Sequence, residues 1–189
     1  PKGAVHIELS ENYFKKHPET VRLSARRGTL HLHQVPEGGE IHWGEGQVRA
    51  ANIRKPLTVR TEHATIRLEE LAAPLDVESY ANTYVALSKQ FKNDDPTQYV
   101  RIEVHGADVA LRIPRQFDGV LQLWHTGINF TDRPPVISTF ELGKPQVAES
   151  SNEDNTMRVR ETSYAQKLGK GGTPIFVHCT NGTITVLQD

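Results

Sequence analysis

Histidine has the widest chemical scope of any residue in this chain, because imidazole binds transition metals and exchanges protons near neutral pH. Nine histidines are present, and His31 and His33 share one face of an expected strand, with His42 close behind. A zinc site needs three or four converging ligands, but an 18-residue repeat sets the cation Arg49 beside His31. HExxH and CxxC motifs do not occur in the sequence. We therefore expect solvated strand histidines, with no metal and no cofactor.

Cys179 is the other candidate for chemistry, as a nucleophile with His178 as its base. Adjacent strand residues point to opposite faces, so these two side chains are not expected to meet. Cys179 alternates with Ile175 and Val177, which predicts a buried structural cysteine. As the only cysteine, it also cannot form an internal disulfide.

Two pairs of adjacent carboxylates could act as acid–base groups or bind calcium: Asp94 with Asp95, and Glu153 with Asp154. Both pairs lie in polar insertions, without the apolar surroundings that keep a carboxylic acid protonated at neutral pH. Acid–base catalysis is therefore not expected, whereas calcium binding stays open. No catalytic, cofactor-binding or metal-binding residue is assigned.

Two glycine-rich runs, residues 44–46 and 169–172, resemble phosphate-binding loops in composition only. Neither lies between a strand and a helix, as a phosphate-binding loop must. Both are interpreted as corners between strands.

Four aromatic residues could form a strip that binds a carbohydrate or a protein: Trp43, Trp124, Tyr80 and Tyr84. The 18-residue step places Trp43 over Thr61, near a corner of the chain path. Aromatic side chains exposed at such a corner anchor partners. Packing within the corner is the alternative interpretation.

The composition limits the partners. The 189 residues carry 22 basic and 23 acidic side chains, a net charge of −1, which argues against nucleic acid and anionic membranes as partners. No window approaches 18 apolar residues, so no membrane span is expected. The sequence begins at Pro1 rather than methionine, which is expected of a processed chain, organellar or exported, or of a trimmed one.

A repeat between Val48 and Leu87 organises the elements that would position these residues. The phrase VRAANIRKPLTVRTEHAT is followed by IRLEELAAPLDVESYANT, an offset of 18 residues, and such a period with apolar alternation is typical of β-solenoids. The step predicts these inward columns: Leu30, Val48, Ile66 and Tyr84; Leu32, Ala50, Leu68 and Ala86; Val35, Ile53 and Leu71; Ile41, Val59 and Val77. It also predicts these outward columns: His31, Arg49 and Arg67; His42, Arg60 and Glu78.

Weaker patterns extend the repeat in both directions. Strands are expected at residues 4–9 and 20–25, with a loop holding at most one helical turn at 10–19 and a turn at 26–28. After a polar loop at 88–98, these matches continue the columns: Val100 on Leu75, Ile102 on Val77, Val109 on Tyr84, Leu121 on Val100, and Leu123 on Ile102, with Gly106 and Gly127 together at a corner.

The chain is accordingly predicted to be one all-β domain, residues 1–189, folded as a single-stranded β-solenoid of about six rungs with polar loop insertions. Regular rungs cover 27–130, an irregular excursion covers 131–173, and a closing rung covers 174–189. The excursion is expected to hold a disorder-prone run at 149–155, one strand at 157–162 and a flexible turn at 169–174. Residues 4–9 and the excursion are the expected caps of the solenoid.

Two stretches resemble the adhesin-like domain family of unknown function. The closing LGKGGTPIFVHCTNGTITVL is similar to the C-terminal signature of that family, and GADVALRIPRQFDGVLQLWHTG is similar to its internal rung. The resemblance covers roughly residue 30 to the C-terminus and implies an elongated right-handed β-helix without enzymatic activity. Bactofilin-like β-helices are similar in period but lack an insertion such as residues 145–174.

These patterns favour a non-catalytic structural or protein-interaction module, either adhesin-like or an accessory subunit of a larger complex. Protein partners are expected at the side faces or end rungs, and nucleic acid is not. A polysaccharide-active β-helix enzyme is the first alternative, which a groove with two or three carboxylates and arginine on one outward face would favour. A polymerising bactofilin-like scaffold is the second alternative.

Overall fold

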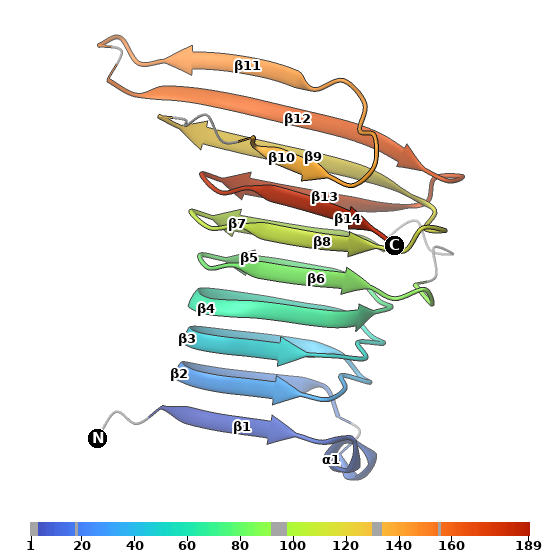
Figure 1. Ribbon diagram of the computed structural model, residues 1–189. Helices are drawn as coiled ribbons and strands as arrows, with labels where there is room; N and C mark the ends of the chain where they lie inside the picture. The colour runs from blue at the N-terminus through green and yellow to red at the C-terminus, as the bar shows by residue number, and fades with distance from the viewer. Residues whose placement is uncertain (1–3, 18, 92–97, 130–133, 155) are drawn as a thin grey trace.

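A computed structural model describes residues 4–17, 19–91, 98–129, 134–154 and 156–189, which form an all-β fold built on one curled, half-barrel sheet (Figure 1). The strands stack along one axis, with β1 and α1 at one end and β11 at the other. The elements are β1 (Val5–Leu9), α1 (Glu11–Lys16), β2 (Val21–Leu32), β3 (Gly39–Ala50), β4 (Leu57–Leu71), β5 (Leu75–Ser79), β6 (Thr83–Leu87), β7 (Val100–His105), β8 (Val109–Ile113), β9 (Gly119–Ile128), β10 (Val136–Ser138), β11 (Gln146–Ser151), β12 (Arg158–Leu168), β13 (Thr173–Thr180) and β14 (Ile184–Gln188). Among the described residues, no helix is long and apolar enough to cross a membrane.

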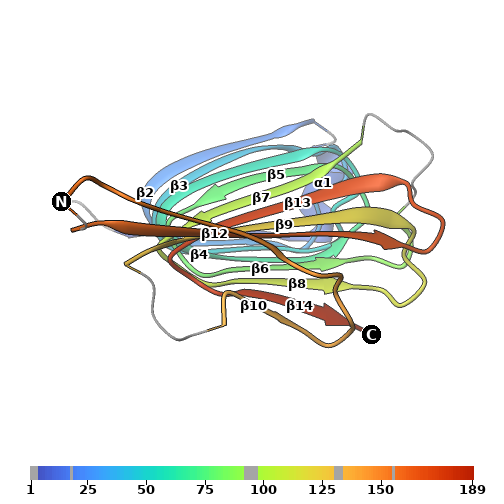
Figure 2. The same ribbon diagram turned by 90° about the horizontal axis from the view of Figure 1, so that it is seen from above.

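The sheet curls because β2, β3 and β4 bend in the middle. In β4, alternate residues are buried over 57–61 and again over 64–68, and the consecutive exposed residues Glu62 and His63 separate the two runs. The first half of the sheet contains the N-terminal parts of β2–β4 with β5, β7, β13, β9, β12 and β11. The second half contains β1, the C-terminal parts of β2–β4, and β6, β8, β14 and β10. The two halves face each other across the core (Figure 2).

The parallel register confirms the predicted 18-residue step over the first strands. Val21 pairs with Gly39, Gly39 with Leu57, and Leu57 with Leu75. The 25-residue step from Leu75 to Val100 is also confirmed.

The core consists of apolar columns that run across the stacked strands. One column holds Ile41, Val59, Val77, Ile102, Val177 and Leu123, none of which is more than 1% exposed. Burial of each such side chain contributes roughly 1.5–3 kcal/mol to folding.

At the β1 end, Phe14 of α1 is 3% exposed and packs against this core. The helix has six residues, slightly more than the single turn expected.

The order of the strands differs from the sequence prediction. Leu121 and Val100 occupy the same column, as predicted, but Ile175 of β13 lies between them and pairs with both. β13 and β14 are therefore inserted between strands formed earlier in the chain, and do not form a closing rung at its end. The end of the first half is formed by the antiparallel strands β12 and β11 instead.

Two column assignments were wrong by one residue. Ile66 pairs with Thr83 rather than Tyr84, and Leu68 pairs with Val85 rather than Ala86. The step from β4 to β6 is thus 17 residues, and Val109 pairs with Thr83. The shift turns Tyr84 outward, where its ring lies 4.7 Å from the Arg67 guanidinium carbon.

Three local predictions also fail. Residues 26–28 do not end a strand, because β2 continues through them while paired with β3 on both sides of its bend. Gly127 is not at a corner, because β9 continues to Ile128 and pairs there with β12. Part of the run expected to be disordered, residues 149–151, belongs to β11, where pairing with β12 satisfies its backbone. Asp94, Asp95 and most of the predicted loop at 88–98 lie outside the described residues.

Candidate functional site

The outer face of the first half carries polar and aromatic side chains that contact one another across several strands. Alternation along each strand brings outward residues of successive strands into rows. One row runs Glu78, Glu103, His178, Trp124 and Ser163, each residue paired in register with the next. These residues come from five strands and are up to 100 positions apart, so only the folded sheet brings them together.

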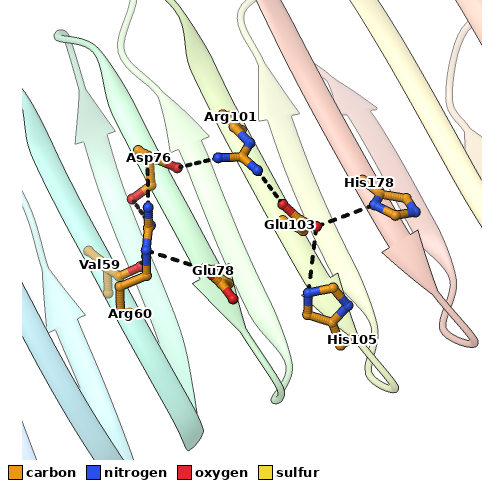
Figure 3. A network of polar contacts seen from close by, with 8 residues as sticks. All are labelled: Val59, Arg60, Asp76, Glu78, Arg101, Glu103, His105 and His178. Atoms are coloured by element: carbon orange, nitrogen blue, oxygen red, sulfur yellow. Dashed lines mark hydrogen bonds and ion pairs between the residues drawn. The ribbon is translucent and has the colours of Figure 1, made fainter.

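Ion pairs connect this face across β4, β5 and β7 (Figure 3). The Arg60 guanidinium lies 2.7 Å from Asp76 (Nη2 to Oδ2) and 3.4 Å from Glu78 (Nε to Oε2). Arg101 lies 3.7 Å from the second oxygen of Asp76 and 2.5 Å from Glu103 Oε2. Two arginines therefore alternate with three carboxylates in a continuous ladder, which holds their long side chains in place.

Two histidines extend the ladder toward β9. Glu103 Oε1 lies 3.7 Å from His105 Nε2 and 3.6 Å from His178 Nδ1. The Thr126 hydroxyl lies 3.1 Å from His178 Nε2, and the Tyr80 ring lies 4.8 Å from that of His105. Glu103 thus connects the ion-pair ladder to the imidazole rings of His105 and His178.

A groove of about 440 Å³ opens beside these groups, over β7, β13, β9 and β12. Its walls include the exposed rings of Trp124 (51% exposed) and Phe176 (38%). Arg101, Glu103, His178 and Lys144 also line it. An apolar groove with a few converging polar groups is the usual form of a small-ligand site.

A second hollow, of about 900 Å³, lies on the same half of the sheet near the bend of β2–β4. His42, Arg60, Glu78 and Tyr80 line it, so it adjoins the ion-pair ladder. The ladder thus separates a polar hollow from an aromatic groove.

The four aromatic residues of the predicted strip have three different positions. Trp43 is buried, 2% exposed, and its indole N–H donates to the Gly28 carbonyl at 3.1 Å, which confirms corner packing. Tyr84 lies in the second half of the sheet beside Arg67. Only Tyr80 and Trp124 are exposed on the candidate face, where Phe176 joins them.

Cys179 is buried and structural, as predicted. Its thiol donates to the Ala107 carbonyl at 3.3 Å, and burial raises its pKa to about 11. His178 points to the opposite, outer face, so it cannot serve as the base of a Cys–His pair. Nucleophilic catalysis by Cys179 with His178 as its base therefore has no geometric basis.

The other candidates remain apart from this face. Glu153 and Asp154 are exposed in the turn between β11 and β12. Residues 44–46 lie within β3 at its bend, and residues 169–172 form the connection from β12 to β13, where the Lys170 amide donates to Asp118 Oδ1 at 2.7 Å. Residues 169–172 are thus a corner between strands, as predicted, whereas residues 44–46 do not separate two strands because β3 continues through them.

A third group of side chains lies on the outer face of the second half. Glu8 of β1 pairs in register with His31, and its Oε1 lies 2.9 Å from His33 Nε2. The rings of His31 and His33 are stacked at 4.4 Å. Potential ligand atoms of the three residues lie within 4.8 Å of one another. The 18-residue step did not reveal Glu8, because α1 lengthens the step from β1 to β2 to 23 residues.

His125 is the one buried histidine among the described residues, on the inner side of β9. Its Nε2–H donates to the Gly182 carbonyl at 2.8 Å, while Nδ1 is buried with no hydrogen-bond partner in the described structure. Burial, more than the nearby His178, lowers its pKa below the usual value of 6.5. As the pH falls, the His125 imidazole therefore takes up a proton in the unfolded chain before it does so in the folded chain.

We predict that this histidine makes the fold acid-sensitive. Stability is complete above about pH 6.5 and falls as pH decreases toward the lowered pKa, because only the unfolded chain takes up the proton. Urea unfolding at pH 7.5 and 5.5 should show a smaller loss for His125→Gln than for the unmodified chain. The exposed His63→Gln variant is the control and should retain the full loss. Equal losses in all three proteins would contradict the prediction.

Comparison with known proteins identifies no relative. The adhesin-like resemblance therefore remains a prediction. No protein-family model matches this chain, and the searches of curated proteins and of solved structures found no match either.

Proposed function

We propose that this chain is a non-catalytic recognition module that binds an extended, neutral carbohydrate on the outer face of the first half of the sheet. The observation that carries the proposal is the groove in which Trp124 and Phe176 are exposed beside Arg101, Glu103 and His178. A sugar ring has C–H groups that stack on aromatic rings and hydroxyls that donate and accept hydrogen bonds. The groove supplies aromatic rings, donors and acceptors within one surface.

The charge of the face favours a neutral ligand. Three cations, Arg60, Arg101 and Lys144, stand against three carboxylates, Asp76, Glu78 and Glu103. A polyanion such as nucleic acid requires a basic stripe instead. The centres of protein–protein interfaces are poor in charged residues, so the charged groups around the aromatic rings also favour a hydroxyl-rich ligand over a protein.

The shape of the face favours an extended ligand. Tyr80 is exposed directly after β5 and Trp124 is exposed on β9, and these two strands are separated by three spacings, through β7 and β13, or about 14 Å. Both rings are next to a histidine, Tyr80 beside His105 and Trp124 beside His178. A short oligosaccharide lying across the strands would contact both rings and cross Glu103 between them.

We infer that this flat face belongs to a β-solenoid of about six rungs. The inference is supported by the 18-residue register from Val21 to Leu75 and by the apolar columns that continue through β7, β13 and β9. Each coil would contribute one strand segment to each half of the sheet. Such stacking repeats outward side chains at the strand spacing, which suits a polymeric ligand.

Carbohydrate cleavage is the rival function on the same face. A polysaccharide-active enzyme would be favoured by two or three carboxylates and arginine on one outward face. This face carries three carboxylates, Asp76, Glu78 and Glu103, together with two arginines. Each of these carboxylates, however, is engaged by an arginine, whereas a glycosidase keeps one carboxylic acid able to protonate the leaving oxygen. Binding without cleavage is therefore the function that the contacts support better.

Strand β11 supports a second candidate function, docking of a protein partner by strand addition. All six of its residues are exposed, Val147 by 56%, and among the described strands it pairs with β12 alone. An open strand edge adds a further strand through backbone hydrogen bonds. This surface would connect the module to an assembly and is separate from the groove.

We predict that Trp124→Ala lowers carbohydrate affinity by about 30-fold, the effect of losing a central aromatic contact of about 2 kcal/mol. The measurement is titration calorimetry with linear neutral oligosaccharides first selected on a polysaccharide panel. Product analysis of the incubated ligand tests for cleavage in the same samples. Light scattering on the free chain reports whether it polymerises.

Tyr99→Ala is the matched control, because Tyr99 is 39% exposed but precedes β7 and does not line the groove. It should bind as well as the unmodified chain. Failure of every polysaccharide to bind, or equal affinity of the Trp124→Ala variant, would refute the proposal. Shortened products that disappear in Glu103→Gln would establish the enzymatic alternative.

A further inference from the structure

The group formed by Glu8, His31 and His33 has the composition and geometry of a metal site. One carboxylate and two imidazoles offer ligand atoms that all lie within 4.8 Å of one another. Zinc lies about 2.0–2.2 Å from nitrogen and oxygen ligands, so its ligand atoms are roughly 3–3.6 Å apart. Glu8 and His33 are already closer than this at 2.9 Å, and both are exposed side chains free to rotate by small amounts.

The backbone holds the three residues in register. Glu8 of β1 is the direct cross-strand partner of His31 in β2, and the His33 amide donates to the Leu9 carbonyl at 3.1 Å. His31 and His33 point to one face because they are two residues apart, while Leu32 between them is fully buried. The buried leucine anchors β2 to the core, so the two imidazoles stand on a rigid strand.

We propose that Glu8, His31 and His33 bind a divalent transition-metal ion, with zinc as the best match. Imidazole nitrogen suits Zn²⁺, Co²⁺ and Ni²⁺, whereas Ca²⁺ and Mg²⁺ prefer sites made of oxygen ligands. Three protein ligands leave a fourth position for water or an external group. The site lies on the second half of the sheet and is independent of the carbohydrate groove.

Glu8 supplies the negative charge of the proposed site. The hydrogen bond from His33 lowers the pKa of Glu8, so this ligand is ionised before the ion arrives. The other charged or titratable groups nearby are His6 on β1, Arg49 on β3 and Glu11 on α1; the last is paired with Lys15 at 3.2 Å.

Arg49 is the one unfavourable neighbour. It pairs in register with His31 on the side opposite to Glu8, so it places a positive charge one strand away from the ion. The sequence-based expectation of no metal rested on this repulsion, without the carboxylate of Glu8. If the site is as proposed, Arg49→Gln should bind the ion about threefold more tightly.

Occupation of the site would fasten the end of the sheet. β1 is an end strand, which pairs with β2 alone among the described strands and over five residues. An ion shared by Glu8 and the two histidines connects both strands through side chains. A ligand that binds only the folded chain raises its stability as its concentration exceeds the dissociation constant, so zinc should raise the melting temperature of the full chain.

The test is titration of the full chain with ZnCl₂ at pH 7.5, together with the visible absorption of added Co²⁺. One equivalent of Zn²⁺ should bind saturably, and both His33→Ala and Glu8→Gln should weaken it at least tenfold and remove the cobalt band. His63→Ala is the control, because His63 is an exposed histidine on β4 outside the group. Circular dichroism checks that each variant is folded.

Two outcomes would overturn the proposal. One is the absence of saturable zinc binding to the folded chain, and the other is equal zinc binding by His33→Ala and the unmodified chain. A tighter complex in Arg49→Gln, together with no change in His63→Ala, would place the ion at this group and not at His63.

Discussion

Trp43→Ala is expected to reduce the free energy of unfolding by about 3–5 kcal/mol. The indole is 2% exposed and lies in a column where its register partners are Ala25 on β2 and Thr61 on β4. These small neighbours make the space that the indole fills, and they cannot fill it when the indole is removed. The variant also loses the hydrogen bond to the Gly28 carbonyl. Since small domains have about 5–15 kcal/mol of stability in total, a large part of the chain should unfold at moderate temperature.

Trp124→Ala is the matched control for this prediction. It removes the same side chain from a position that is 51% exposed on the outer face of β9, so the expected loss is within about 0.5 kcal/mol. Urea unfolding followed by circular dichroism measures both variants, and similar slopes against urea would show that they share one unfolding transition. Equal losses for the two tryptophans would mean that Trp43 does not support the core.

The contrast between the two tryptophans was partly visible in the sequence. The 18-residue step set Trp43 over Thr61, near a corner of the chain path, where packing within the corner was one of the two interpretations. Trp124 alternates with the inward residues Leu121 and Leu123, which indicates an outward position. Alternation thus predicts which side of a strand a residue faces, and this part of the prediction is confirmed at Cys179 as well.

The stacking order could not be predicted in the same way. Val100, Leu121 and Ile175 satisfy the same column equally well, and the structure places Ile175 in the middle. A repeat specifies the position of a residue along a coil but not which coil lies next to it. After β9 the chain forms β10, β11 and β12 in the same sheet before β13 enters between β7 and β9, and the order follows from contacts that are distant in sequence.

Both candidate sites depend on this missing information. The groove needs Phe176 and His178 of β13 between Arg101 and Trp124, and simple succession of coils would have left them elsewhere. The group of His31 and His33 includes Glu8, whose pairing with His31 does not follow the 18-residue step because α1 lies between β1 and β2. The sequence therefore drew attention to His31, His33 and Trp124, but not to Glu8 or Phe176 beside them.

The one-residue error at Tyr84 has a physical reason. An inward tyrosine would bury its hydroxyl in the narrow interior, whereas Thr83 in that position is 3% exposed and donates to the Ala81 carbonyl at 3.1 Å. The step shortens between the pairs Thr61–Ser79 and Ile66–Thr83, where β4 bends and β5 gives way to β6. Satisfaction of polar groups thus prevailed over strict repetition.

Gly46→Ala is expected to reduce the free energy of unfolding by about 2–4 kcal/mol, because the bend of β3 has no room for a side chain. A Cβ at this position would lie 2.0 Å from the Gly28 carbonyl oxygen of β2, and the backbone φ of +112° is strained for any residue but glycine. The atoms that obstruct it belong to backbone, so relief requires β2 and β3 to separate where they pair.

Gly143→Ala is the control, because its nearest atoms would be 3.7 Å from the added carbon and its φ is not positive. Its stability should stay within about 0.5 kcal/mol of the unmodified chain. The same urea measurement distinguishes the two variants, and hydrogen exchange would show faster amide exchange in β2 and β3 of Gly46→Ala. If Gly46→Ala were as stable as Gly143→Ala, the close approach of the two strands would not be a requirement of the bend, and the curl of the sheet would have to arise from side-chain packing instead.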